Sequence, residues 1–203
     1  YTNVATGLTA TTYTNTDLTN GTTYYYVVSA SNASGESANS AQASATPTGT
    51  TAASLTLQYK AADTNAADNQ IKPHFRLMNN GTTAVSLSDV TIRYWYTSDG
   101  TQPQTAECDY AQVGCTNINR TITTLATPRT GADTYLELSF SAGAGIIAGG
   151  GNSGEMQMRL HRNDWTNYNE TGDYSFDPTK TAFADWNRVT VYVDGVLVWG
   201  TEP

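Results

Sequence analysis

The sequence is poor in charged residues, and basic residues are the scarcer kind. Asp, Glu, Lys and Arg make up only 14% of the 203 residues, and 18 acidic against 10 basic residues give a formal net charge of −8. This balance repels the phosphate backbone of nucleic acids and the anionic surface of membranes, so we expect neither as a partner. A neutral polymer is neither attracted nor repelled by this net charge.

Long apolar runs are missing as well. No stretch of the sequence approaches the roughly 18 apolar residues that a transmembrane helix needs. The chain begins with Tyr1 rather than Met, and it carries no signal-peptide pattern. We therefore expect it to be a piece of a longer protein.

Cysteine is limited to Cys108 and Cys115. The spacing between them matches no zinc or redox motif, and two thiols cannot enclose a metal ion. We favour a local disulfide that closes a surface loop, and the alternative is two independent thiols. A disulfide would agree with an oxidising, extracellular setting, so we expect the protein to be secreted.

Catalytic motifs are also absent. The sequence has no nucleophile elbow and no Ser-x-x-Lys, His-Glu-x-x-His or phosphate-loop pattern, and its only histidines are His74 and His161. With 18 acidic residues, a pair of carboxylates can always be nominated as acid and base. Because such a pair carries no weight without a local motif, we expect no enzymatic activity.

Residues 1–47 differ from the rest of the chain. The segment 18–24 has the spacing Leu-x-x-Gly-x-x-Tyr, and apolar residues then alternate from Tyr24 to Ala30. This pattern resembles the second half of a fibronectin type III domain. The resemblance implies that Tyr24 is the corner tyrosine, whose hydroxyl bonds back to the preceding loop. The earlier strands of such a domain are absent, so we expect this partial sandwich to be marginally stable alone. Residues 48–53 are expected to be a flexible linker.

Short alternating runs dominate from residue 54 onward. A period of two is typical of strands with one buried face, and no long stretch has the period of 3.6 that an amphipathic helix requires. Asp194-Gly195 between valines is the strongest hairpin signal. We therefore predict an all-β domain over residues 54–203, built as a two-sheet β-sandwich.

Five motifs stand out in this domain. The most informative is the run 155–176, in which an alternating strand (Glu-Met-Gln-Met-Arg-Leu) leads into a polar loop that carries the isolated Trp165. The others are 71–73 (Ile-Lys-Pro), 93–100 (Arg-Tyr-Trp-Tyr-Thr-Ser-Asp-Gly), 108–111 (Cys-Asp-Tyr-Ala) and 198–203 (Val-Trp-Gly-Thr-Glu-Pro). Together they resemble the motifs of the family 3 carbohydrate-binding modules, which attach secreted enzymes to cellulose. The resemblance covers residues 54–203 and implies jelly-roll wiring.

The resemblance also implies a flat strip of residues that meets the polysaccharide. Its positions fall here on Asp109, Tyr110, Arg159 and Trp165, and we expect Asp109 and Arg159 to form a planar ion pair about the size of a sugar ring. Further anchoring positions fall on Gln157 and Asn69, and Asp63 and Asn65 lie near Asn69 in the sequence. The loop at 114–117 is too short to supply the additional tyrosine of the longest strips, so a shorter strip is expected here. For each strip residue the alternative is ordinary surface or loop packing.

A structural calcium ion is implied by two further segments, 97–100 and 169–173. The ligands that the resemblance maps are Thr97, Asp99, the Asn169 carbonyl and Asp173, which are the hard oxygens that Ca²⁺ prefers. Gly172 stands where some relatives have an asparagine ligand. The alternative is that Asp99-Gly100 is only a turn and Asp173 only a loop cap.

The sequence thus favours a non-catalytic, monomeric module that targets a tethered glycoside hydrolase to cellulose or a related insoluble polysaccharide. The catalytic domain would lie N-terminal to Tyr1, with the fibronectin-like segment as a spacer. An alternative is an interaction module that packs against its own catalytic domain without gripping crystalline cellulose. Retention of Tyr110 and Trp165 favours the first. A third, weaker hypothesis is an adhesive surface domain without polysaccharide selectivity.

Overall fold

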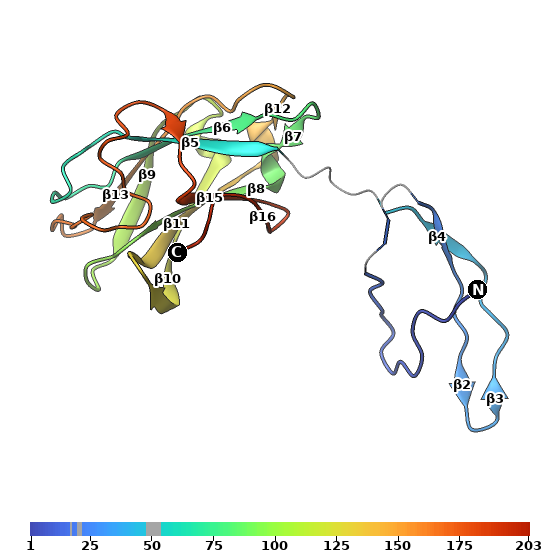
Figure 1. Ribbon diagram of the computed structural model, residues 1–203. Coiled ribbons are helices and arrows are strands. Elements are labelled where there is room, and N and C mark those ends of the chain that lie inside the picture. The colour runs from blue at the N-terminus through green and yellow to red at the C-terminus, as the bar shows by residue number, and fades with distance from the viewer. Residues whose placement is uncertain (17, 20–21, 48–53) are drawn as a thin grey trace. The chain divides into compact units, whose positions relative to one another are not determined.

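The computed structural model describes residues 1–16, 18–19, 22–47 and 54–203. The chain forms two compact units, Tyr1–Ala52 and Ala53–Pro203 (Figure 1). The regular structure of both units is almost entirely β-strand, and the only helices in the described part of the chain are three short 3₁₀ turns. No helix among these residues has the length and apolar character needed to cross a membrane.

The N-terminal unit contains four short strands in two antiparallel pairs. Strand β1 (Tyr24–Tyr26) pairs with β4 (Ala43–Ala45), and β2 (Ser31–Asn32) pairs with β3 (Gly35–Glu36). The Tyr24 hydroxyl accepts a hydrogen bond from the Thr19 backbone N–H at 2.9 Å, the contact expected of a corner tyrosine. Two residues of the Leu-x-x-Gly-x-x-Tyr motif and the expected linker 48–53 lie outside the described residues.

The C-terminal unit is a sandwich of two five-stranded sheets, as predicted. We call the sheet ordered β14-β5-β6-β13-β9 sheet I, and the sheet ordered β10-β11-β8-β15-β16 sheet II. Sheet I comprises β5 (Leu55–Ala61), β6 (Pro73–Asn79), β9 (Gln104–Ala111), β13 (Met156–Arg162) and β14 (Ala184–Asp185). Sheet II comprises β8 (Val90–Tyr96), β10 (Ile118–Arg129), β11 (Ala132–Phe140), β15 (Val189–Val193) and β16 (Val196–Trp199).

All strand pairs within both sheets are antiparallel. The chain passes repeatedly from one sheet to the other, between β6 and β8, β8 and β9, β9 and β10, β11 and β13, and β14 and β15. Such crossings are what jelly-roll wiring requires. A small pair, β7 (Val85–Ser86) with β12 (Ile146–Ile147), and the turns η1 (Leu87–Asp89), η2 (Cys115–Asn117) and η3 (Ala142–Ala144) complete the unit.

The core lies between the sheets and follows the alternation of the sequence. Along β5, β6 and β13 every second residue is buried, because successive side chains of a strand point to opposite faces. In β13 the buried residues are Met156, Met158 and Leu160, so the residues between them face outward from sheet I. The buried cluster also includes Leu57, Phe75, Ile92, Tyr94, Leu136, Leu138, Val189 and Val191.

The predicted hairpin joins β15 to β16. Val193 pairs with Val196, and the two residues between them, Asp194 and Gly195, have φ angles of 50° and 77°. Positive φ at both central positions is the geometry of a type I′ turn, which Asp-Gly favours and which fits the twist of the flanking strands.

Candidate functional site

The candidate site is built on the outer face of sheet I, along β13. The outward residues of this strand are Gln157, Arg159 and His161, each two residues from the next. Strand β9 runs antiparallel beside β13 (Figure 1) and forms the edge of the sheet. Side chains held on neighbouring strands start from a rigid backbone, so little conformational freedom is lost when they bind a ligand.

A β-bulge in strand β9 aligns Asp109 with Arg159. Gln157 pairs with Tyr110 and Met158 pairs with Cys108, so Asp109 is the extra residue of the bulged strand. The Arg159 guanidinium donates from Nε to Asp109 Oδ2 at 2.9 Å and from Nη2 to Oδ1 at 2.9 Å. Hydrogen bonds from Arg159 are the main cause that lowers the pKa of the Asp109 carboxyl. The two groups therefore form the planar, bidentate pair that was predicted.

The strip residues on β9 sit in a loop closed by a disulfide. Cys108 and Cys115 are bonded to each other, and the chain they enclose carries Asp109 and Tyr110. Tyr110 is 49% exposed, so its ring is accessible to a ligand. The disulfide limits the freedom of this segment in the unfolded chain and so favours its folded geometry.

Trp165 lies over the end of β13, stacked on His161. The two rings are 4.2 Å apart between centroids, and their planes differ by 1°. The indole is 48% exposed, and Trp165 has a φ angle of 59° that bulky residues rarely adopt. His161 was not among the residues predicted for the site, although its position two residues after Arg159 places it on the same face of β13.

The loop that carries Asn69 lies near the same end of β13 as Trp165. A backbone bridge between Ile71 and Leu160 fixes this approach, and Asn69 is half-buried within the loop. Asp63 lies in the same loop but accepts a hydrogen bond from the Lys72 ammonium at 3.1 Å. Its carboxylate is therefore engaged within the protein.

The four residues mapped to a cation site lie in two loops that meet. Asp173 Oδ1 lies 2.5 Å from Thr97 Oγ1 and accepts the Thr97 backbone N–H at 3.0 Å. Asp99 Oδ1 lies 3.3 Å from Thr97 Oγ1, and Asp99 Oδ2 accepts the Asn169 backbone N–H at 2.6 Å. Gly172 has a φ angle of 88° and supplies no side-chain ligand.

Two observations test whether these residues fit a cation. Asp173 Oδ2 is buried, and among the described residues it has no hydrogen-bond partner. Burial, together with the nearby Asp99 and Asp133 carboxylates, raises the pKa of the Asp173 carboxyl to about 7, although hydrogen bonds from Thr97 act in the opposite direction. The described residues contain no cluster of three His, Cys, Asp or Glu side chains suited to a metal, so neutral oxygens would have to complete the shell. Calcium accepts such mixed oxygen sets, and the residues fit it.

The profile of the family described as "Cellulose binding domain" matches residues 56–200. The chain belongs to the family 3 cellulose-binding domains. The regions that match in this family are carbohydrate-binding modules, which are non-catalytic accessory parts of cellulases and scaffoldins.

Similar proteins agree with this assignment. Endoglucanase A of Paenibacillus lautus is 52% identical over 152 residues, which are 73% of this chain and 21% of the endoglucanase. The chain therefore spans only about a fifth of that relative. The CBM3b domain of the scaffoldin subunit ScaA from Acetivibrio cellulolyticus is 42% identical, with a TM-score of 0.71, over 74% of this chain and 97% of the domain. The CBM3b of cellobiohydrolase 9A from Clostridium thermocellum is 34% identical, with a TM-score of 0.67, over 73% and 97%.

Proposed function

We propose that residues 54–203 bind the flat surface of cellulose through the outer face of sheet I. The contact elements follow one another along β13: Tyr110 beside Gln157, then the Asp109–Arg159 pair, then Trp165 on His161. At about 3.3 Å per residue, the strand from Gln157 to His161 spans about 13 Å. The proposal depends on one observation, which is this row of an exposed ring, a planar ion pair and a second exposed ring.

The chemistry of the row suits a glucan chain. Cellulose exposes the C–H faces of its sugar rings, and aromatic side chains stack on such apolar faces while their polar edges stay wet. The guanidinium–carboxylate pair is flat and still has N–H and oxygen groups for hydroxyls. Gln157, with Asn69 from the neighbouring loop, offers amide donors and acceptors at the side of the row.

Joined to a catalytic domain, this module would serve for targeting. Binding to an insoluble substrate raises the effective concentration of a tethered glycoside hydrolase there, without chemistry of its own. The presence of similar domains in an endoglucanase, a cellobiohydrolase and a scaffoldin supports this role. It also supports secretion, since cellulose lies outside the cell. Residues 1–47 would act as a partial fibronectin type III spacer, followed by the linker 48–53.

A structural calcium ion at Thr97, Asp99, Asn169 and Asp173 forms part of the same proposal. Its support is the buried Asp173 Oδ2, which has no hydrogen-bond partner in the described part of the chain, and the Asp99 carboxylate, which contacts the same Thr97 hydroxyl as Asp173. The cation would neutralise two carboxylates that share one hydroxyl and would hold loop 97–100 against loop 169–173.

The experiment is a pull-down on microcrystalline and on amorphous cellulose with the wild-type chain and Trp165→Ala. We expect wild type in the pellet and Trp165→Ala mostly in the supernatant. Tyr25→Ala is the matched control, because Tyr25 is an aromatic residue of similar exposure (55%) in the other unit, and its loss should change nothing. Wild type left in the supernatant with both celluloses would instead favour a module that packs against its own catalytic domain.

A further inference from the structure

Arg162 is a buried cation at the end of β13. It follows His161 in the strand and therefore points to the inner side, where its side chain is only 7% exposed. Its Nε has no hydrogen-bond partner among the described residues. Burying a charge costs free energy unless it is well paired, so the contacts of this guanidinium need an explanation.

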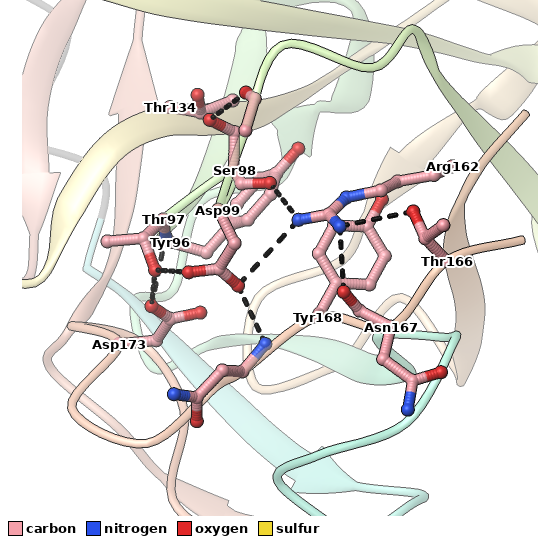
Figure 2. A network of polar contacts seen from close by, with 12 residues as sticks. Tyr96, Thr97, Ser98, Asp99, Thr134, Arg162, Thr166, Asn167, Tyr168 and Asp173 are labelled. Atoms are coloured by element: carbon pink, nitrogen blue, oxygen red, sulfur yellow. Dashed lines mark hydrogen bonds and ion pairs between the residues drawn. The ribbon is translucent and has the colours of Figure 1, made fainter. Parts of the chain in front are cut away.

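Figure 2 shows the guanidinium between two loops. Toward the loop after β8, Nη2 donates to the Ser98 carbonyl at 2.5 Å and lies 3.9 Å from Asp99 Oδ2. Toward the loop after β13, Nη1 donates to the Asn167 carbonyl at 2.7 Å and to Thr166 Oγ1 at 3.2 Å. One planar group thus ties two segments that are more than sixty residues apart in the sequence.

The second of these loops carries Trp165. The Trp165 backbone N–H donates to the Arg162 carbonyl at 3.0 Å, so the loop is tied to Arg162 by both main chain and side chain. Trp165 also has its φ angle at 59°, a left-handed conformation that residues other than glycine rarely adopt. Such a conformation persists only where the surroundings hold it.

The ring of Tyr168 packs against the Arg162 guanidinium. The guanidinium carbon of Arg162 lies 4.7 Å from the centre of this ring, and Tyr168 is itself buried. Thr166 Oγ1 also donates to Asp164 Oδ1 at 2.8 Å, which extends the network to the residue next to Trp165. The backbone on both sides of Trp165 is therefore linked to Arg162.

We propose that Arg162 is a positioning residue for cellulose binding: by tying the Trp165 loop to the Ser98 loop, it holds the indole flat on His161. The part of this inference that concerns cellulose rests on the proposed function. The part that concerns the geometry of Trp165 does not. Lysine cannot replace Arg162, because an ammonium lacks the planar fork that reaches both loops at once.

The test begins with Arg162→Lys in the absence of cellulose. The chain has 4 tryptophans, so its ¹⁵N NMR spectrum has four indole N–H signals, and Trp165→Phe identifies that of Trp165. We expect Arg162→Lys to shift or broaden the Trp165 signal and leave the other three in place. A change in all four signals, or in none, would overturn the proposal. Arg120→Lys is the matched control, since Arg120 also donates to backbone carbonyls, of Ala106 and Ile118, and should leave the Trp165 signal unchanged.

Cellulose binding supplies the second readout. We expect Arg162→Lys to weaken binding about tenfold, the scale of one lost charge-assisted hydrogen bond, and to have little further effect in a Trp165→Ala background. Equal effects in both backgrounds would overturn the proposal. If Trp165→Ala itself binds normally, the proposed function fails while the NMR result still decides the role of Arg162. If Arg162→Lys does not fold, Thr166→Val removes one bond of the same network and should shift the same indole signal less.

Discussion

The indole of Trp165 lies parallel to the imidazole of His161, with ring centroids 4.2 Å apart and an angle of 1° between the planes. His161 is fixed by strand β13, whereas Trp165 belongs to the loop that follows. Because the indole stacks on a residue of the rigid sheet, the stack limits the movement of Trp165. One face of the indole packs on His161, and the other face can meet a sugar ring.

Removal of this support should weaken binding without unfolding the domain. We expect His161→Ala to lower cellulose affinity by about 2–10-fold, since aromatic pairs contribute about 0.5–1.5 kcal/mol beyond their buried area. His161→Phe keeps a flat ring under the indole and should restore most of the affinity. Binding isotherms on microcrystalline cellulose measure both. Equal losses in the two variants would show that the ring is not what matters.

The Asp109–Arg159 pair should survive mild acid. Hydrogen bonds from Arg159 hold the pKa of the Asp109 carboxyl below its ordinary value of about 3.9. The contribution of the pair is thus complete above that ordinary value and is lost only as the pH falls through the lowered one. We expect the contribution of this pair to cellulose binding to be constant from pH 7 to about pH 4.5.

Asp109→Asn should reduce affinity at pH 7 by no more than about fivefold, because an exposed ion pair contributes at most about 1 kcal/mol. Its binding should also lack the part of the acid dependence that Asp109 causes. Isotherms of both proteins from pH 7 down to about pH 3, which passes below the ordinary carboxyl pKa, provide the measurement. Loss of wild-type binding at pH 5, absent from Asp109→Asn, would contradict the lowered pKa.

The disulfide should stabilise the domain and order the strip. The two cysteines are separated by 7 positions, and closing so short a loop contributes about 2 kcal/mol in the chain-entropy description. We expect the Cys108→Ala/Cys115→Ala variant to lose about that much free energy of unfolding in urea. Cellulose binding should also weaken, because Asp109 and Tyr110 lie in the released loop. An unchanged unfolding midpoint would contradict the first expectation, and unchanged affinity the second.

Calcium should raise the melting temperature of the domain, and chelation should lower it. A ligand at about 100 times its Kd adds about 2.7 kcal/mol, which corresponds to about 5–10 °C for a chain of this size. We expect this difference in wild type and its absence in Asp173→Asn. Asp194→Asn is the matched control, since Asp194 lies in the exposed β15–β16 turn. Calorimetric scans with EDTA and with Ca²⁺ measure the difference in melting temperature, and identical wild-type scans would rule out the site.

Much of the fold could be predicted because the sheet pattern is local. The alternation in 155–160 placed Met156 and Met158 inside and Gln157 and Arg159 outside, and Asp194-Gly195 marked a hairpin that the structure contains. In the N-terminal unit the alternation from Tyr24 to Ala30 suggested a longer strand than the one that forms, which ends at Tyr26. Alternation reports the direction of side chains, but only pairing with a neighbour defines a strand.

The roles of His161 and Arg162 could not be predicted in the same way. A histidine at the end of an exposed strand face and an arginine before a polar loop are ordinary on their own. Their significance arises from the path of residues 163–169, which returns Trp165 to the strand through a positive φ angle, and from a loop near Ser98 that is distant in sequence.

The sequence by itself determined which side chains point outward from β13, because a strand has a period of two. It also determined that the loop between Cys108 and Cys115 is short. Only the tertiary structure decided that β9 lies beside β13 with a bulge at Asp109, that Trp165 rests on His161, and that Arg162 joins two distant loops. Those relationships depend on strand register, loop path and burial, which arise when segments far apart in the chain pack together.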